Sequence, residues 1–348
     1  MSSQECVRLA VAVEIPKRIR VSVGSAIVLD LLSGKLDAAP TTAYLMTYRK
    51  GKCVANCGFC PQARGSHGRA NMLSRVSWPV FATKRVLGGI EKAVKDDRIK
   101  RVCFQALNYP EVFTHLTALI RTVHQKADVP ISISCQPLNS GNIKALADAG
   151  AERIGIPLDA ATEELFDKIK GPATGGPYCW EKQFKLLGEA VQIFGKGKIS
   201  THLIVGLGET EKEMVKIIQR CVDMSVLPAL FAFTPISGTA LGNNVQPPIQ
   251  KYRRIQIARH LIVHGIAGYE DMRFDEEGCI SDFSVDEQTL LQIIQMGEPF
   301  HTSGCPNCNR PYYNEKPSGP IYNYPRKIGQ KELSEIESQL SLPGELKS

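Results

Sequence analysis

The sequence predicts an α/β fold in which a parallel sheet curls into a complete or partial barrel. Three observations carry this prediction: six segments with strand character, helical patterns between them, and strand faces of opposite polarity. Strands that alternate with helices form parallel sheets, because each right-handed crossover places the next strand parallel to the last. The predicted strands are Thr42–Tyr48, Arg101–Leu107, Ile131–Gln136, Arg153–Leu158, Ile199–Val205 and Ala229–Thr234.

The segments between these strands have the spacing of amphipathic helices. From Glu213 onward, apolar residues recur at positions i, i+3, i+4, i+7 and i+8. A second helical pattern follows the turn Asn139–Gly141 and stops at Gly150, a residue that commonly ends helices. The alternation of strand and helix therefore continues through the middle of the chain.

Alternation along the later strands predicts a polar inner face. In the third strand, Ser134 and Gln136 lie on the face opposite Ile133, and Asp159 and His202 occupy the corresponding faces of the next two strands. A parallel strand covered by helices on both sides has a continuous apolar sequence. One polar face per strand therefore predicts a cavity for solvent or a ligand, and a tightly packed apolar barrel interior is the alternative.

Composition places the chain among ordinary soluble globular proteins. It has 348 residues, of which 43% are hydrophobic and 22% charged. No run approaches the roughly 18 consecutive apolar residues of a transmembrane helix. Segment 1–18 contains Glu5 and Glu14 and is a poor signal peptide, which predicts a cytoplasmic protein. The net charge of +7 is spread along the chain and gives no support for a dedicated nucleic-acid binder.

The eleven cysteines are the most unusual feature. Their odd number and the poor export signal favour metal ligation in a reducing compartment over a disulfide framework. Six of them form two groups, at residues 53–60 and 279–308. The others stand alone and are expected to be small buried hydrophobic residues: Cys6, Cys103, Cys135, Cys179 and Cys221.

The first group, Cys53, Cys57 and Cys60, has the spacing C-x3-C-x2-C just after the first predicted strand. Three close thiolates can hold three corners of a 4Fe–4S cluster and leave one iron open. The open iron can bind the amino and carboxylate groups of S-adenosylmethionine, and an electron passed through the cluster can then cleave its C–S bond to give a 5′-deoxyadenosyl radical. A zinc knuckle with His67 as fourth ligand is the alternative.

The second group is Cys279, Cys305 and Cys308. A C-x2-C pair in a turn rich in Pro and Asn is a metal clamp in many proteins. Together the three thiolates could hold a second 4Fe–4S cluster whose fourth ligand is not a cysteine. A structural zinc site completed by His301 is the alternative. The candidates for the non-cysteine ligand of the cluster are Ser303, Ser318 and Arg310.

The motif C-x3-C-x-aromatic-C after the first strand of a βα repeat resembles the radical S-adenosylmethionine (radical SAM) superfamily. The resemblance covers about residues 40–265. It implies a partial (β/α)6 TIM-like barrel over residues 41–265, with an N-terminal extension at 1–40 and a C-terminal auxiliary-cluster segment at 266–348. It also implies that the first cysteine group, Cys53, Cys57 and Cys60, ligates the catalytic cluster.

The resemblance further implies a binding site for S-adenosylmethionine. Phe59 matches the aromatic position whose backbone lies near the adenine, and Asp159 matches an acid that binds the ribose. After the second strand, the superfamily often has Gly-Gly-Glu, which binds the methionyl amine of S-adenosylmethionine. This chain has Gln105 followed by Ala-Leu-Asn at that place. The amine is therefore expected to contact either Gln105 or backbone carbonyls. Ser134 and His202 would border the adenosyl group.

Further blocks narrow the resemblance. Ile204–Thr210 matches the fifth-strand segment of the biotin-synthase branch, while Cys57–Arg64 and Cys305–Glu315 resemble the second component of two-protein archaeal lipoyl synthases. This implies a sulfurtransferase that inserts sulfur into a protein-bound octanoyl chain, with the second cluster as sulfur donor. The implied partners are an octanoylated lipoyl carrier protein or domain, a partner radical SAM lipoyl synthase subunit, and an electron donor such as ferredoxin.

Two alternatives remain open from the sequence. One is a radical SAM enzyme of the biotin-synthase or maturase type, in which the second cluster only relays electrons. The other is a zinc-stabilised binding protein without enzymatic activity, in which the cysteines are structural.

Overall fold

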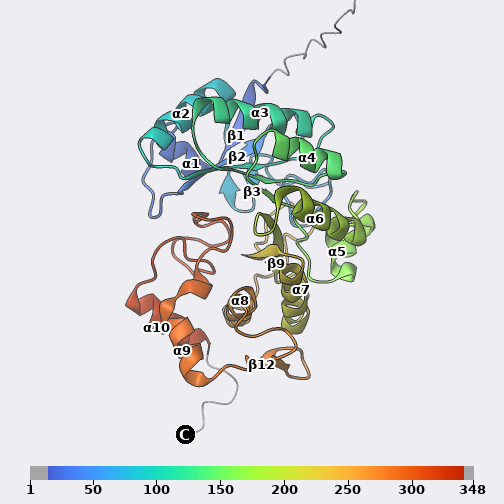
Figure 1. Cartoon of the computed structure of the whole chain (residues 1–348), viewed down its shortest axis with the longest axis vertical. Coiled ribbons are helices and arrows are strands. Elements are labelled where there is room, and N and C mark those ends of the chain that lie inside the picture. Colours follow the sequence, from blue (N-terminus) through green and yellow to red (C-terminus); the bar gives the residue numbers. More distant parts are fainter. Residues whose placement is uncertain (1–14, 341–348) are drawn as a thin grey trace, which may run out of the picture.

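The computed structural model describes residues 15–340 (Figure 1). Cys6 and most of the segment that argued against a signal peptide lie outside the described residues. Within the described part, no helix is long and apolar enough to cross a bilayer.

The central sheet has eight strands in the order β10-β9-β8-β7-β6-β2-β1-β5. Within residues 15–340, β10 and β5 end the sheet without pairing with each other, so the barrel is partial. The six parallel strands are those predicted from the sequence, which confirms the α/β class. They are β2 (Thr42–Thr47), β6 (Arg101–Gln105), β7 (Ile131–Ser134), β8 (Arg153–Gly155), β9 (Ile199–Val205) and β10 (Val226–Ala232).

Two antiparallel strands extend this sheet beyond β2. β1 (Arg18–Val21) pairs with β2 on one side and with β5 (Val80–Ala82) on the other, and Ile19 lies opposite Thr47. Part of the segment expected as an N-terminal extension therefore belongs to the barrel sheet. Between β2 and β5 lies a small hairpin, β3 (Met72–Leu73) and β4 (Val76–Ser77).

Helices follow the parallel strands and cover the outside of the sheet (Figure 1). The sequence sets their ends locally: at α7, Thr210 and Glu213 form a reciprocal capping box, and at α4 the Asn139 side chain caps the first turn. The helices up to the end of the barrel are α1 (Val23–Val28), α2 (Thr83–Lys95), α3 (Val112–Lys126), α4 (Ser140–Asp148), α5 (Glu163–Ile169), α6 (Trp180–Phe194), α7 (Glu211–Asp223) and α8 (Ile249–Val263), with a 3-10 turn η1 (Pro172–Thr174).

The C-terminal part packs on α8 and then returns to the barrel. Its elements are β11 (Arg273–Phe274), β12 (Ile280–Asp282), α9 (Glu287–Met296), η2 (Glu298–Phe300) and α10 (Gln330–Gln339). After η2 the chain runs back to the start of β2, where Thr41 donates its N–H to Asn309 Oδ1 over 3.1 Å. The cysteine pair near residue 305 is thereby brought to the barrel.

Candidate active site

The inner face of the sheet borders a cavity of about 550 Å³. Ser134, Asp159 and His202 line it, as do other residues of the polar strand faces. Residues on the other face of these strands, such as Ile156 and Leu203, are fully buried in the core. The cavity predicted beside the polar strand faces is therefore present, although apolar side chains such as Ile204 and Phe231 also line it. A tightly packed apolar interior is excluded by the cavity.

The first cysteine group, here called the first triad (Cys53, Cys57 and Cys60), lines the cavity in the loop after β2. Hydrogen bonds within the protein hold this loop in place. Lys52 Nζ donates to the carbonyl oxygens of Pro61, Ser66 and Gly68 over 2.9, 2.5 and 2.8 Å. The N–H of Gly58 donates to the carbonyl of Ile169 over 2.7 Å, which ties the loop to α5.

The first triad fits a cluster with three protein ligands. Burial raises the pKa of Cys60 to about 12 and raises that of Cys57 further. Both thiols are therefore protonated without a cation, and bound iron would replace those protons. His67, the proposed fourth ligand of a zinc knuckle, does not line the cavity.

The second set of predicted cluster ligands is not brought together. Cys305 and Cys308 line the cavity, but Cys279 does not. Cys279 lies in the turn between β11 and β12, where its N–H donates to Asp275 Oδ1 over 2.8 Å. The hairpin docks on α7 because the N–H of Ile280 donates to the carboxylate of Glu211 over 2.8 Å.

Cys103 of β6 joins Cys305 and Cys308 instead, and these three residues are called the second triad. Burial is the main cause that raises the pKa of the Cys103 thiol, and the neighbouring Cys305 and Cys308 raise it further. Arg101 holds the turn in place, donating from Nε to the carbonyl of Pro306 over 3.3 Å. Cys103 is therefore not the isolated buried cysteine expected from its sequence surroundings.

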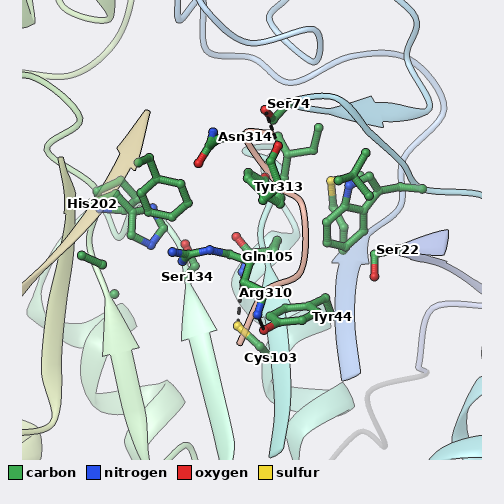
Figure 2. Close-up of a pocket in the computed structure, with 18 of the residues that line it drawn as sticks. Ser22, Tyr44, Ser74, Cys103, Gln105, Ser134, His202, Arg310, Tyr313 and Asn314 are labelled. Carbon is green, nitrogen blue, oxygen red and sulfur yellow. Dashed lines mark hydrogen bonds between the residues drawn. The ribbon is translucent and has the colours of Figure 1, made fainter. Parts of the chain in front are cut away.

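Each thiol of the second triad has a neutral polar neighbour. The hydroxyl of Tyr44 lies 3.3 Å from Cys308 Sγ, and Ser132 Oγ donates to Cys305 Sγ over 3.4 Å. Gln105, expected near the methionyl amine, donates from Nε2 to Cys103 Sγ over 3.2 Å (Figure 2). Hydrogen bonds to ligating sulfurs tune the potential of an iron–sulfur cluster.

Arg310 is the one candidate for the non-cysteine ligand that lines the cavity, whereas Ser303 and Ser318 do not. The backbone N–H of Arg310 donates to the Tyr44 hydroxyl over 2.8 Å. The guanidinium carbon of Arg310 lies 3.8 Å from the centre of the Phe231 ring. Figure 2 shows this side chain between Tyr44 and His202. The Ser303 hydroxyl instead accepts from the N–H of Leu230 over 2.8 Å.

Asp159, matched to the ribose-binding acid, forms a buried ion pair. Its Oδ2 lies 2.6 Å from Lys170 Nζ, and the Lys170 side chain is fully buried. Lys170 also donates to the carbonyl of Pro157 over 2.8 Å and lies 5.0 Å from the centre of the Tyr178 ring. The ion pair thus orients the carboxylate at the cavity wall beside the first triad.

The remaining predicted contacts, Phe59, Ser134 and His202, all line the cavity. Burial, with the positive charges of Arg310 and Lys170, lowers the pKa of His202 to about 3. His202 is therefore a neutral imidazole at physiological pH and can both donate and accept a hydrogen bond.

Sequence reasoning missed Cys103, Lys170 and Tyr44. A signal existed for Cys103, because it is two residues before Gln105 and therefore shares its strand face. No spacing pattern distinguishes Lys170 or Tyr44, since each acquires its role from residues distant in the chain.

Residues 49–221 match the model of the radical SAM superfamily. Similar curated proteins are biotin synthases. The biotin synthase of Buchnera aphidicola subsp. Acyrthosiphon pisum (strain APS) is 25% identical over 222 residues, which cover 62% of this chain and 60% of that one. The biotin synthase of Chlamydia pneumoniae is 25% identical over 237 residues, which cover 63% of each chain. A third, from Sulfurihydrogenibium sp., is 26% identical over 204 residues, covering 57% of each. The match thus spans about 60% of the length of these relatives.

Solved structures that are similar include the FeFe-hydrogenase maturase HydG from Carboxydothermus hydrogenoformans, with a TM-score of 0.49 at 16% identity, covering 64% of this chain and 52% of that one. Methylornithine synthase (PylB) has a TM-score of 0.48 at 12% identity, covering 79% of this chain and 85% of that one. The family model and the curated relatives, with the cysteine motif at the cavity, show that the chain belongs to the radical SAM superfamily.

Proposed function

We propose that this protein inserts sulfur into a protein-bound octanoyl chain, as one component of a two-subunit lipoyl synthase. The observation that carries the proposal is that two separate cysteine triads line one cavity. The first triad would hold the 4Fe–4S cluster that, with S-adenosylmethionine, supplies radical chemistry. The second triad would hold a 4Fe–4S cluster that donates sulfur.

The chain's own residues support binding of S-adenosylmethionine at the first triad. Asp159, oriented by Lys170, presents a carboxylate that can accept hydrogen bonds from ribose hydroxyls. Neutral His202 and Ser134 offer further polar contacts on the same inner face. Gln105 donates from Nε2 to Cys103 Sγ, which leaves its Oε1 as an acceptor, so Gln105 and backbone carbonyls both stay proposed contacts of the methionyl amine.

The second triad has the properties expected of a sulfur donor. Arg310 lies close to Cys103 and Cys308, so a cluster held by the second triad would have a non-cysteine group beside it. A corner without a cysteine suits release of sulfide to a substrate, because fewer iron–thiolate bonds must break. Arg310 itself is held by Tyr44 and packed on Phe231, so it can stay in place as the cluster is consumed.

The proposed substrate is an octanoyl chain amide-linked to a lysine of a lipoyl carrier protein or domain. Leu36, Leu73 and Val76 line one part of the cavity and offer an apolar surface for an acyl chain, and Lys35 and Arg75 lie among them. A net charge of +7 suits encounter with an acidic carrier. A partner radical SAM subunit and an electron donor such as ferredoxin complete the proposed system.

The test is anaerobic incubation of cluster-loaded protein with an octanoyl-lysyl peptide, S-adenosylmethionine and reductant, followed by mass spectrometry. We expect one sulfur atom added per peptide by this chain alone, and two in the presence of the partner subunit. The Cys308→Ala variant and a peptide with unmodified lysine are the controls, and neither should gain sulfur. Full lipoyl formation by this chain alone would refute the two-subunit part, and no sulfur addition with the pair would refute the whole.

A second candidate is a biotin-synthase-type reaction or a maturase with a cluster that only relays electrons. The names of the curated relatives favour it. It is distinguished by counting sulfide: a donating cluster loses sulfide in proportion to product, whereas a relaying cluster keeps its sulfide over many turnovers.

A further inference from the structure

A cluster of possible metal ligands lies outside the cavity, where α8 meets η2. His260 and His264 are four residues apart at the C-terminal end of α8, and Glu298 is the first residue of η2. One ligand atom from each of the three lies within 4.8 Å of the others. Within the described residues, no other three groups of this kind come together so closely.

The two imidazoles are arranged as a pair. Residues four apart on a helix share one face, and here the ring centres of His260 and His264 are 4.3 Å apart. His260 is buried, whereas His264 and Glu298 are exposed. The site is thus open to ions from solvent on one side and anchored in the protein on the other.

Glu298 is exposed and its carboxylate is available to a ligand. Among the described residues, it makes no ion pair or side-chain hydrogen bond that would compete with a bound ion.

The backbone explains why Glu298 faces this helix. Gly297 has φ of 74°, which ends α9 and turns the chain into η2. Phe300, at the end of η2, is fully buried, and the guanidinium carbon of Arg253 on α8 lies 5.4 Å from the centre of its ring. η2 is thereby held against α8.

We propose that His260, His264 and Glu298 form a binding site for a divalent transition metal, with Zn²⁺ as the fitting ion. Two imidazoles and one carboxylate leave a fourth position for water, a common zinc coordination. Ligand atoms around tetrahedral Zn²⁺ are about 3.3 Å apart, so small side-chain rotations bring these atoms into range. A bound ion would cross-link α8 to η2, just before the segment that carries Cys305 and Cys308.

The site is tested in protein whose cysteine clusters have been loaded anaerobically, so that thiolates do not compete for zinc. Wild type, His264→Ala and Glu298→Gln are equilibrated with buffered free Zn²⁺, and bound zinc is counted by mass spectrometry. The variants change exposed residues, so folding should be unaffected. The control variants are His124→Ala and Glu287→Gln, which change an exposed histidine and an exposed glutamate elsewhere.

We expect one more zinc ion per wild-type chain than per His264→Ala chain. The affinity for zinc should fall by about tenfold or more in either site variant, because even mutation of residues that only support metal ligands lowers affinity by about tenfold or more. Zinc should also raise the melting temperature of wild type and both controls, but not of the site variants. Equal zinc content in wild type and site variants, no zinc in wild type, or an equal loss in the controls would each overturn the proposal. The readout is independent of sulfur transfer.

Discussion

The two cysteine triads differ in how the chain builds them. The first comes from one loop, residues 53–60, and all three thiols follow from local spacing. The second combines Cys103 of a central strand with two cysteines of the C-terminal segment, and 264 residues separate Cys308 from its neighbour Tyr44. The comparison teaches that a motif can reveal a local cluster site, whereas a site shared by distant segments depends on how the chain packs.

The surroundings of the triads differ as well. Beside the first triad lies a buried ion pair, Asp159 with Lys170. The second is bordered by the neutral side chains of Tyr44, Ser132 and Gln105. The guanidinium groups of Arg310 and Arg101 act on Cys308 as well. The first environment suits a charged, polar ligand such as S-adenosylmethionine. The second suits adjustment of a cluster's potential and of the release of its sulfide.

The largest expected effect separates the roles of the two triads. Cys57→Ala should abolish reductive cleavage of S-adenosylmethionine, because the first cluster loses a ligand. Cys308→Ala should retain cleavage but stop sulfur insertion. Each variant should hold about four irons per chain where wild type holds about eight, since each triad would hold one four-iron cluster. The measurements are 5′-deoxyadenosine release and iron content; equal loss of cleavage in both variants would show that the triads do not act separately.

The second prediction compares the two possible third ligands of the C-terminal pair. Cys103→Ala should lower iron by about four atoms per chain, one 4Fe–4S cluster, whereas Cys279→Ala should leave iron content unchanged. The reason is that Cys103 borders the cavity with Cys305 and Cys308, and Cys279 does not. Iron counting after anaerobic reconstitution decides between them, and the reverse result would restore the ligand set expected from sequence.

The third prediction concerns the ion pair beside the first triad. Lys170→Met leaves Asp159 buried without its partner, and breaking a buried pair in this way costs about 3 to 5 kcal/mol of unfolding free energy. The matched control is Lys168→Met, whose pair with Glu164 is largely exposed and should contribute less than about 1 kcal/mol. Urea unfolding measures both. Similar small losses would mean that Asp159 finds another partner.

The smallest effect is expected beside the second triad. Tyr44→Phe removes the acceptor for the N–H of Arg310 and the hydroxyl next to Cys308. Loss of one such partly buried hydrogen bond costs about 0.5 to 1.5 kcal/mol, so unfolding free energy should fall by that amount while iron content stays at the wild-type level. Cleavage of S-adenosylmethionine should be unchanged. A loss of iron would instead identify Tyr44 as necessary for cluster assembly.

Most of the barrel could be predicted because its signals are local. β7 and β9 show alternation within a few residues, and Thr210 with Glu213 marks the start of α7. The inner faces then follow from the period of two along a strand, which places Ser134 and His202 at the cavity. The addition of β1 and β5 to the sheet edge was not predicted, because antiparallel pairing of short segments leaves no periodic pattern.

The sequence by itself determined the six parallel strands, the polar cavity face and the first triad, because each depends on residues close together in the chain. Only the tertiary structure decided that Cys103 replaces Cys279 beside Cys305 and Cys308, and that Lys170 holds Asp159. The physical reason is that these contacts depend on the path of the C-terminal segment and of the loop after α5. Their positions are fixed by packing and buried hydrogen bonds, which no local spacing encodes.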